Sequence, residues 1–222
     1  MNMYIYCLPI HNLTFTDSDA CLLKFISSQR QNKVLRYHFD IDQKLSLYSA
    51  LLVRKVLSDL SGIPTNNLLF YCQLNHKPEL INLPRYKFSF SHTRNFILCC
   101  LSLEKEVGAD VERIENPPYE IMEQVFHPDE ILYVLSSKNP AVAFYEIWTK
   151  KEAYTKFLKT GLTGSLAQIN TLQHELATSF LTWCEGNYMC SVYGDTPRRT
   201  NITHVSEIDI NVYYDLNSLS GL

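Results

Sequence analysis

Two acidic side chains lie close together near the middle of the chain. The short apolar segment 107–112 reads as a β-strand and carries Asp110 and Glu112 two residues apart. Side chains at this spacing share one face of a strand, where two carboxylates repel each other unless a cation lies between them. Magnesium takes hard oxygen ligands of this kind together with phosphate oxygens and water. The alternative is a solvated strand end with two surface acids, while Gly108 would let a ligand or a second backbone approach closely.

A third acid lies in a helical segment downstream. Phe144 and Ile147 define an apolar helix face, and Lys151 falls on the same face. An unpaired ammonium is costly to bury, so Lys151 must reach solvent or meet an anion. Glu152 and Lys156 stand four residues apart at the edge of this face. The alternative is an ordinary exposed helical ion pair, worth roughly 0.3–0.5 kcal/mol.

A serine and a histidine end a further predicted strand. In the strand expected over 86–91, Phe88 and Phe90 share one face and would enter the core. Ser91 and His92 then fall at the strand end, where a loop presents them to a ligand and a histidine can donate to a phosphate oxygen. The alternative is a structural histidine.

The elements that must position these residues follow from periodicity and from turn residues. A helix over 43–60 is expected after a cap at Asp42, and a second helix after a cap at Asn139, with Pro140 as its first residue and Gly161 as its end. A further helix begins at Pro128. The remaining expected elements are a helical stretch over 17–36 and strands over 4–8, 68–73, 86–91, 96–103, 107–112, 179–184, 188–193 and 208–214.

Each half of this pattern has one long amphipathic helix and several strands. This predicts an α+β architecture of two similar lobes, joined near residues 104–106, so that the N-terminal lobe is 1–105 and the C-terminal lobe is 106–222.

Composition excludes several classes of protein. The 222 residues are 46% hydrophobic and 19% charged, which is ordinary for a soluble globular chain, and the net charge of −3 argues against a nucleic-acid partner. The seven cysteines include no Cys-x-x-Cys pair, which argues against a zinc knuckle or a disulfide framework and favours reduced thiols. No signal peptide and no membrane-length apolar run is visible, so we expect a cytoplasmic protein without a membrane partner. A phosphate-binding Gly-x-x-x-x-Gly-Lys-Ser/Thr loop is also absent, which argues against a P-loop kinase or NTPase.

Taken in chain order, the motifs resemble those of the Sfp-type 4′-phosphopantetheinyl transferases. That family has a Gly-Lys-Pro turn, a Ser-His strand end, a Gly-x-Asp-x-Glu strand and a Trp-x-x-Lys-Glu-x-x-x-Lys helix. This sequence has His-Lys-Pro at 76–78, Ser-His at 91–92, Gly-Ala-Asp-Val-Glu at 108–112 and the helix motif at 148–156. The resemblance spans roughly residues 25–165, and its last two motifs together are highly specific.

The resemblance implies an enzyme that moves the phosphopantetheine arm of coenzyme A onto a serine of an apo acyl or peptidyl carrier protein, releasing 3′,5′-ADP. It implies a monomeric pseudo-dimer of two α/β lobes, with coenzyme A in the cleft between them. It also implies a requirement for Mg²⁺, with Mn²⁺ as a substitute.

The roles it implies for individual residues are as follows. Asp110, Glu112 and Glu152 hold the metal ion, and Glu152, Lys156 and Asp110 are catalytic. The residues implied to bind coenzyme A are Lys77, Ser91 and His92 at the nucleotide end, with His92 at the 3′-phosphate, Lys151 and Lys156 at the pyrophosphate, and Arg30 and Lys33 at phosphate.

Two positions depart from the family pattern. His76 replaces the glycine before Lys-Pro, and Lys44-Leu45 stands where the family often has an arginine for the nucleotide phosphate. Three other functions remain open: a non-catalytic coenzyme A-binding protein of the same fold, an unrelated Mg²⁺-nucleotide enzyme, and an interaction module. The sequence does not identify the carrier protein.

Overall fold

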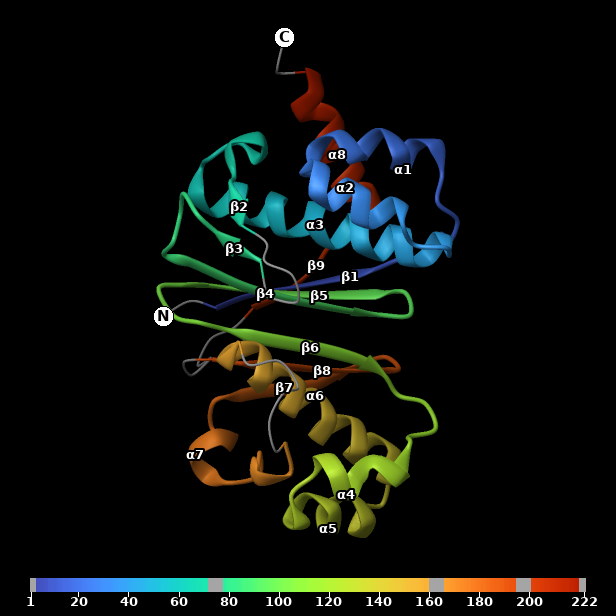
Figure 1. Ribbon diagram of the computed structural model, residues 1–222, viewed down its shortest axis with the longest axis vertical. Helices are drawn as coiled ribbons and strands as arrows, with labels where there is room; N and C mark the ends of the chain where they lie inside the picture. The colour runs from blue at the N-terminus through green and yellow to red at the C-terminus, as the bar shows by residue number, and fades with distance from the viewer. Residues whose placement is uncertain (1–2, 72–77, 160–165, 195–200, 220–222) are drawn as a thin grey trace.

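The computed structural model describes residues 3–71, 78–159, 166–194 and 201–219, without the side chains of 201 and 216–219. Two lobes lie one above the other, each with its sheet toward the middle of the molecule and its long helix outside (Figure 1). Mixed helices and sheets in two α/β lobes confirm the predicted fold class. None of the described helices combines the length and apolar character that crossing a bilayer requires.

The N-terminal lobe is built on a four-stranded sheet ordered β4-β5-β1-β9. These strands span Tyr86–Thr93 (β4), Phe96–Leu103 (β5), Met3–Pro9 (β1) and Asn201–His204 (β9). The sheet is antiparallel except that β9 runs parallel to β1. Its outer face is covered by α1 (Asp17–Leu22), α2 (Ser28–Leu35), α3 (Asp40–Ser61) and α8 (Glu207–Leu219), and a small β2–β3 ribbon (Phe70–Tyr71, Glu79–Leu80) lies beside it.

The C-terminal lobe has a three-stranded antiparallel sheet ordered β6-β8-β7, spanning Gly108–Arg113, Tyr188–Tyr193 and Phe180–Glu185. Its long helix is α6 (Pro140–Leu158), against which α4 (Met122–Val125) and α5 (Pro128–Ser136) pack, and α7 (His174–Ala177) precedes β7. Short 3₁₀ turns lie at Leu23–Phe25, Thr65–Asn67, Tyr119–Ile121 and Leu166–Gln168.

The two sheets share a core of their own. Alternate residues of β1 and β5, among them Ile5 and Leu98, face alternate residues of β6 and β8, among them Val111 and Val192, and all four are buried. The other faces of β1 and β5 point toward α3. The lobes are therefore joined by an apolar sheet-to-sheet contact, which fixes the position of β6 relative to β4.

Several predicted elements are confirmed. Asn139 caps α6 by accepting a hydrogen bond from the Val142 backbone, and Pro140 is the first residue of that helix. Gly62, at φ 73°, ends α3 in the left-handed conformation that glycine tolerates. Two expected boundaries were wrong: Asp42 lies in the first turn of α3 rather than at its cap, and Ser27 starts α2 as a separate helix within 17–36.

The predicted strand over 208–214 was wrong, because this segment lies in α8. Apolar residues at every second position also place Ile210 and Tyr214 four apart, and these two are fully buried while Ile208 is 71% exposed. Ser206 and Asp209 bond reciprocally in a capping box, a helix signal present in the sequence.

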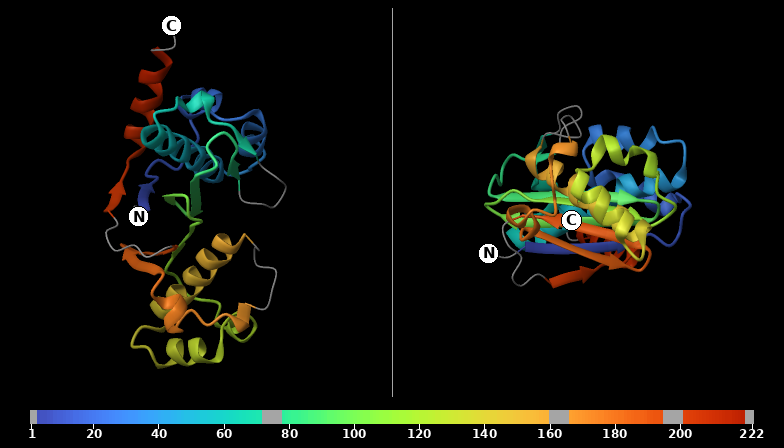
Figure 2. Two further views of the ribbon diagram at one scale, coloured as in Figure 1. Left: turned by 90° about the vertical axis from the view of Figure 1, so that its left-hand side faces the viewer. Right: turned by 90° about the horizontal axis from the view of Figure 1, so that it is seen from below.

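The predicted division into 1–105 and 106–222 needs one correction. Strand β9 pairs with β1, and Tyr214 of α8 donates a hydrogen bond to the Leu51 carbonyl oxygen of α3 at 2.9 Å. Residues 201–219 therefore pack on the N-terminal lobe (Figure 2, where red β9 lies beside blue β1 in the left panel).

Candidate active site

The site begins with a close contact between a strand and a helix. A Cβ atom at Gly108 would lie 1.8 Å from the Ala153 carbonyl oxygen, so only glycine lets α6 pack this near β6. The close approach expected at Gly108 is therefore that of a second backbone. As a result, Glu152 and Lys156 of α6 come next to the acids of β6.

Asp110 is the centre of the cluster. It is 2% exposed, and its Oδ1 accepts hydrogen bonds from Lys156 Nζ at 2.6 Å and from Ser91 Oγ at 2.8 Å. Lys156 Nζ also donates to Ser91 Oγ at 2.9 Å. The second oxygen, Oδ2, is buried and has no hydrogen-bond partner in the part of the chain that the structure describes. A buried carboxylate oxygen without a donor is suited to a cation.

Two further carboxylates surround Asp110. Glu112 accepts a hydrogen bond from Thr93 Oγ1 at 3.0 Å, and burial, followed by the charge of Asp110, raises its pKa to about 7. Burial and then Asp110 also raise the pKa of Glu152. Like charges held this close favour either protonation or a bound cation. Asp110, Glu112 and Glu152 thus bring three carboxylates into one region, and oxygen donors of this kind could hold a hard divalent ion.

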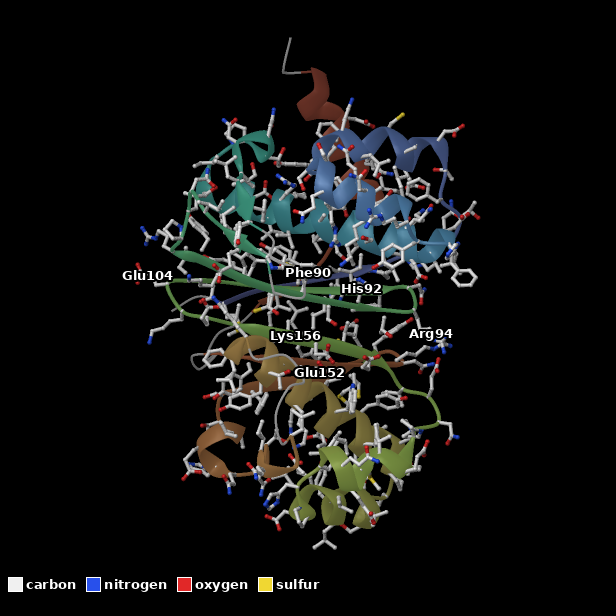
Figure 3. The ribbon with its side chains drawn as sticks, viewed as in Figure 1. Phe90, His92, Arg94, Glu104, Glu152 and Lys156 are labelled. Carbon is white, nitrogen blue, oxygen red and sulfur yellow. The ribbon has the colours of Figure 1, made fainter. Side chains whose placement is uncertain are left out.

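Strand β4 of the N-terminal lobe faces β6 and forms the other side of the site. It continues to Thr93, so Ser91 and His92 lie within the strand rather than at its end and point to opposite faces. The Ser91 hydroxyl belongs to the acidic cluster, because it donates to Asp110. Burial, followed by the positive charges of Arg30, Lys156 and Lys33, lowers the pKa of His92 to about 4. Figure 3 shows His92 above, and Glu152 and Lys156 below, the boundary between the lobes.

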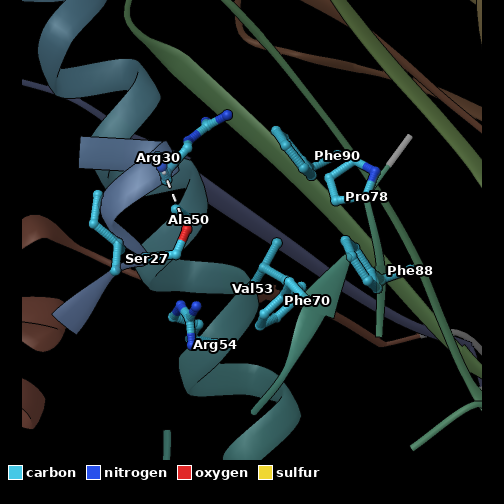
Figure 4. A pocket seen from close by; sticks show the side chains of 10 residues that line it. Ser27, Arg30, Ala50, Val53, Arg54, Phe70, Pro78, Phe88 and Phe90 are labelled. Atoms are coloured by element: carbon cyan, nitrogen blue, oxygen red, sulfur yellow. Dashed lines mark hydrogen bonds between the residues drawn. The ribbon is translucent and has the colours of Figure 1, made fainter. Parts of the chain in front are cut away.

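Next to His92 is an apolar pocket between α2, α3 and β4. Phe90, Phe88 and Pro78 line it, with Arg30 at its edge (Figure 4). Arg30 donates to the Ser46 carbonyl oxygen through Nη2 at 2.8 Å, which holds its guanidinium beside the Phe90 ring. Of the expected basic residues, Arg30 and Lys33 thus lie near His92, and Lys77 lies outside the described residues.

Lys151 lies elsewhere, which corrects its expected place at the pyrophosphate. It is 1% exposed and points to α5, where Nζ lies 2.7 Å from Glu130 Oε2 and donates to the Leu166 carbonyl oxygen at 2.8 Å. Burial lowers the pKa of Lys151, and Glu130 opposes this shift. The anion that a buried lysine requires is supplied by the protein itself.

Lys44 and Leu45, which stand where the family often has an arginine, are also structural residues. Leu45 is a core residue, and Lys44 is 2% exposed, with Nζ 2.9 Å from Glu207 and 3.5 Å from Asp19. Lys44 therefore binds α8 to α3 and does not substitute for a phosphate ligand. His76, the other departure, lies outside the described residues.

Sequence reasoning named Ser91 of β4 but missed the hydroxyl groups of Ser89 and Thr93 on the same strand. Ser89 accepts from the Ala109 backbone at 3.0 Å, and Ser91 and Thr93 bond Asp110 and Glu112. These three residues alternate along β4, as do the acids along β6. This shared period of two is the sequence signal that could have matched the side chains of β4 with those of β6.

Models of known protein families match both halves of the chain. A model described as "4'-phosphopantetheinyl transferase, N-terminal" matches residues 16–103, and one described as "4'-phosphopantetheinyl transferase superfamily" matches residues 106–202. The chain belongs to the 4′-phosphopantetheinyl transferase superfamily. The two matches meet at the join between the lobes, and the superfamily match contains Asp110, Glu112, Glu152 and Lys156.

Individual members of the superfamily are similar to this chain over part of its length. The chain is 34% identical over 139 residues to 4'-phosphopantetheinyl transferase gsp of Aneurinibacillus migulanus, covering 62% of this chain and 57% of that protein. It is 26% identical to the transferase psf-1 of Bacillus pumilus, covering 66% and 63%. Against the transferase Sfp of Bacillus subtilis (strain 168) it is 25% identical over 78% of each chain. The matches to the first two thus span less than two thirds of the length of those relatives.

Proposed function

We propose that this chain is a Mg²⁺-dependent 4′-phosphopantetheinyl transferase that moves the phosphopantetheine arm of coenzyme A onto a serine of an apo acyl or peptidyl carrier protein, releasing 3′,5′-ADP. The observation that carries the proposal is the unpartnered, buried Oδ2 of Asp110 among three carboxylates and Lys156. Superfamily membership supplies the reaction class.

In this proposal, Asp110, Glu112 and Glu152 hold the metal ion. Mg²⁺ bound there, or Mn²⁺ in its place, would neutralise negative charge on the pyrophosphate of coenzyme A. Holding the ion keeps the acids ionised, because a cation favours the charged form of each carboxyl group. Transfer of a phosphoryl group depends mainly on positioning and electrostatics of this kind.

Lys156 and Glu152 carry out proton transfer in this proposal. Lys156 Nζ is fixed by Asp110 and Ser91 and stands 30% exposed, so it donates to the bridging oxygen of the departing 3′,5′-ADP. Glu152, directly or through a water molecule, takes the proton from the carrier serine.

The nucleotide end is assigned to the neighbouring basic residues. His92, Arg30 and Lys33 meet the phosphates of that end, with His92 at the 3′-phosphate, and Lys77 is proposed to join them. The apolar pocket beside Phe90 adjoins this group. Within this proposal the protein is cytoplasmic and has neither a nucleic-acid nor a membrane partner.

The test separates transfer from mere binding. The protein is mixed with coenzyme A, Mg²⁺ and a panel of apo-carriers from fatty-acid, polyketide, peptide-synthetase and lysine pathways, and released 3′,5′-ADP is measured. Release that needs both a carrier and the protein supports the proposal and identifies the carrier class. Coenzyme A binding without 3′,5′-ADP from any carrier would show a non-catalytic binding protein.

A further inference from the structure

Three strands bring a cysteine, a glutamate and a histidine together at the edge of the molecule far from β4. Cys7 of β1 and His204 of β9 are direct partners in the parallel ladder, and Glu185 ends β7 of the other lobe. Their ligand atoms, Cys7 Sγ, a Glu185 carboxylate oxygen and a His204 ring nitrogen, all lie within 4.8 Å of one another. The sheet order β4-β5-β1-β9 puts this cluster at the opposite edge from the Asp110 site.

We infer that Cys7, Glu185 and His204 form a zinc-binding site that fastens β9 and β1 of one lobe to β7 of the other. One sulfur, one nitrogen and one carboxylate oxygen are the donors that Zn²⁺ takes in proteins, and three protein ligands leave the fourth tetrahedral position to water. The soft thiolate selects against Mg²⁺, which prefers hard oxygen donors. The site is therefore chemically distinct from the carboxylate cluster at Asp110.

The surroundings of the three side chains suit such a site. Cys7 is fully buried, whereas the side chains of Glu185 and His204 are 32% and 59% exposed, so an ion has a path from solvent. His204 Nε2 already lies 3.1 Å from Glu185 Oε1. This contact pairs two members of the cluster, and an ion between them would recruit the buried thiol as the third.

Binding requires a defined movement of protons. In the absence of a metal ion, burial and then Glu185 raise the pKa of Cys7 to about 12, so the thiol is protonated. The Cys7 S–H bond breaks as a sulfur electron pair forms the S–Zn bond, and one proton leaves to solvent. The Nε2 lone pair of neutral His204 binds the ion with the ring proton on Nδ1. The thiolate and the Glu185 carboxylate then balance the two charges of Zn²⁺.

Cobalt reports such a site without reference to enzymatic activity. The full chain is stripped with a chelator, desalted, kept in excess Mg²⁺ to fill oxygen sites, and titrated with Co²⁺. We expect one Co²⁺ per chain, a near-ultraviolet thiolate-to-cobalt charge-transfer band, and displacement by Zn²⁺. Zinc at 100 times its dissociation constant is expected to raise the melting temperature by roughly 5–10 °C.

Variants assign the ligands. Cys7→Ser is expected to abolish the band. Since Cys7 is a core residue and this variant is at risk of misfolding, Glu185→Gln and His204→Ala, at partly exposed positions, test the same site and are expected to weaken Co²⁺ binding at least about 10-fold. The matched control is Cys184→Ser, an exposed thiol one residue from Glu185, which should bind as the wild type does.

The inference is overturned if wild-type protein gives no charge-transfer band. It is equally overturned if Glu185→Gln and His204→Ala both bind Co²⁺ with unchanged affinity, or if Cys184→Ser loses the band. Because every readout is metal binding or melting, its failure is independent of the phosphopantetheinyl transfer proposed above.

Discussion

At the scale of single residues, the site is a balance of charges around Asp110. One of its oxygens is bound by Lys156 and Ser91, and the other is buried without a donor in the described structure. Glu112 and Glu152 add negative charge that burial makes costly. The three acids repel one another unless a cation binds between them, so they do not stabilise the empty site. Replacing one of them should therefore affect function more than folding.

Glu152→Gln tests this directly. The amide keeps the shape of the side chain but neither holds a cation by charge nor accepts a proton at neutral pH. We expect carrier modification to slow by at least about 100-fold, the scale seen when one preorganised electrostatic group is lost. Melting should stay close to wild type, and coenzyme A binding should survive in part.

The matched control is Glu146→Gln on the same helix, where the carboxylate pairs with Lys150 and Tyr133 away from the cluster. It should leave the rate unchanged. Near-normal transfer by Glu152→Gln, or simple unfolding, would remove Glu152 from the active site.

His92 gives a pH prediction. Its folded-state pKa of about 4 lies below the ordinary 6.5, because burial and then Arg30, Lys156 and Lys33 disfavour the cation. Between these values the unfolded chain binds a proton that the folded chain does not, so stability is lost as the pH falls from about 6.5 to about 4. At about 1.4 kcal/mol per pH unit, the loss from pH 6.5 to pH 5 is at most about 2 kcal/mol.

Urea unfolding of wild type and His92→Gln at both pH values measures this loss. The variant should lose less stability than the wild type over this interval, and the exposed His38→Gln should behave as wild type. Equal losses for His92→Gln and wild type would show that His92 does not carry the effect.

At the scale of elements, adjacent residues of α6 have different roles: some belong to the proposed active site and one stabilises the lobe. Glu152 and Lys156 face β6, while Lys151 is buried against α5. Glu130 of α5 also accepts from the Thr171 backbone and hydroxyl, at 2.8 and 2.7 Å. The Lys151–Glu130 pair therefore ties α5, α6 and the segment before α7 together.

Lys151→Met should destabilise the fold without entering the chemistry. It leaves Glu130 buried without its cation, which costs about 3–5 kcal/mol. Lys150→Met, one residue earlier, removes an i,i+4 pair with Glu146 and should cost about 1 kcal/mol or less. Denaturant titration compares the two variants. A Lys151→Met protein as stable as Lys150→Met, but inactive, would return Lys151 to the pyrophosphate.

Local signals made the elements around the site predictable. The Asn139 cap and the hairpin at 185–188 each act within a few residues, and the sequence contains them in full. Partners far apart in sequence did not follow from it. Lys151 lies on the apolar face of its helix, and a lysine there could equally bind a ligand or form an internal ion pair. The position of α5, which brings Glu130 to Lys151, shows that the ion pair forms.

The same limit applied at the C-terminal end of the chain. Alternating apolar residues at 208–214 suit both a strand and a helix that buries every fourth residue, and the capping box at Ser206 was the deciding signal. Asp110 and Glu112 were predicted together because a strand period of two is a local rule. Their grouping with Glu152 of the distant helix came from the family resemblance alone.

At the scale of the whole molecule, one chain supplies both walls of the site. Strand β4 belongs to the first lobe, and β6 and α6 belong to the second, with a buried sheet-to-sheet core behind them. A second copy is not needed to complete the cluster. We therefore expect this 222-residue chain to be an active monomer of 25.7 kDa by light scattering at micromolar concentration. A stable dimer or trimer that loses activity on dilution would contradict this expectation.

The most direct test of the central proposal is the intact mass of an apo-carrier protein after incubation with the enzyme and coenzyme A. With Mg²⁺, the carrier should gain the mass of one phosphopantetheine arm, and a carrier whose acceptor serine is replaced by alanine should gain nothing. Excess chelator should stop the gain, and added Mg²⁺ or Mn²⁺ should restore it. Full modification in excess chelator would contradict the metal site at Asp110, and an unchanged mass for every carrier class in Mg²⁺ would contradict the transferase itself.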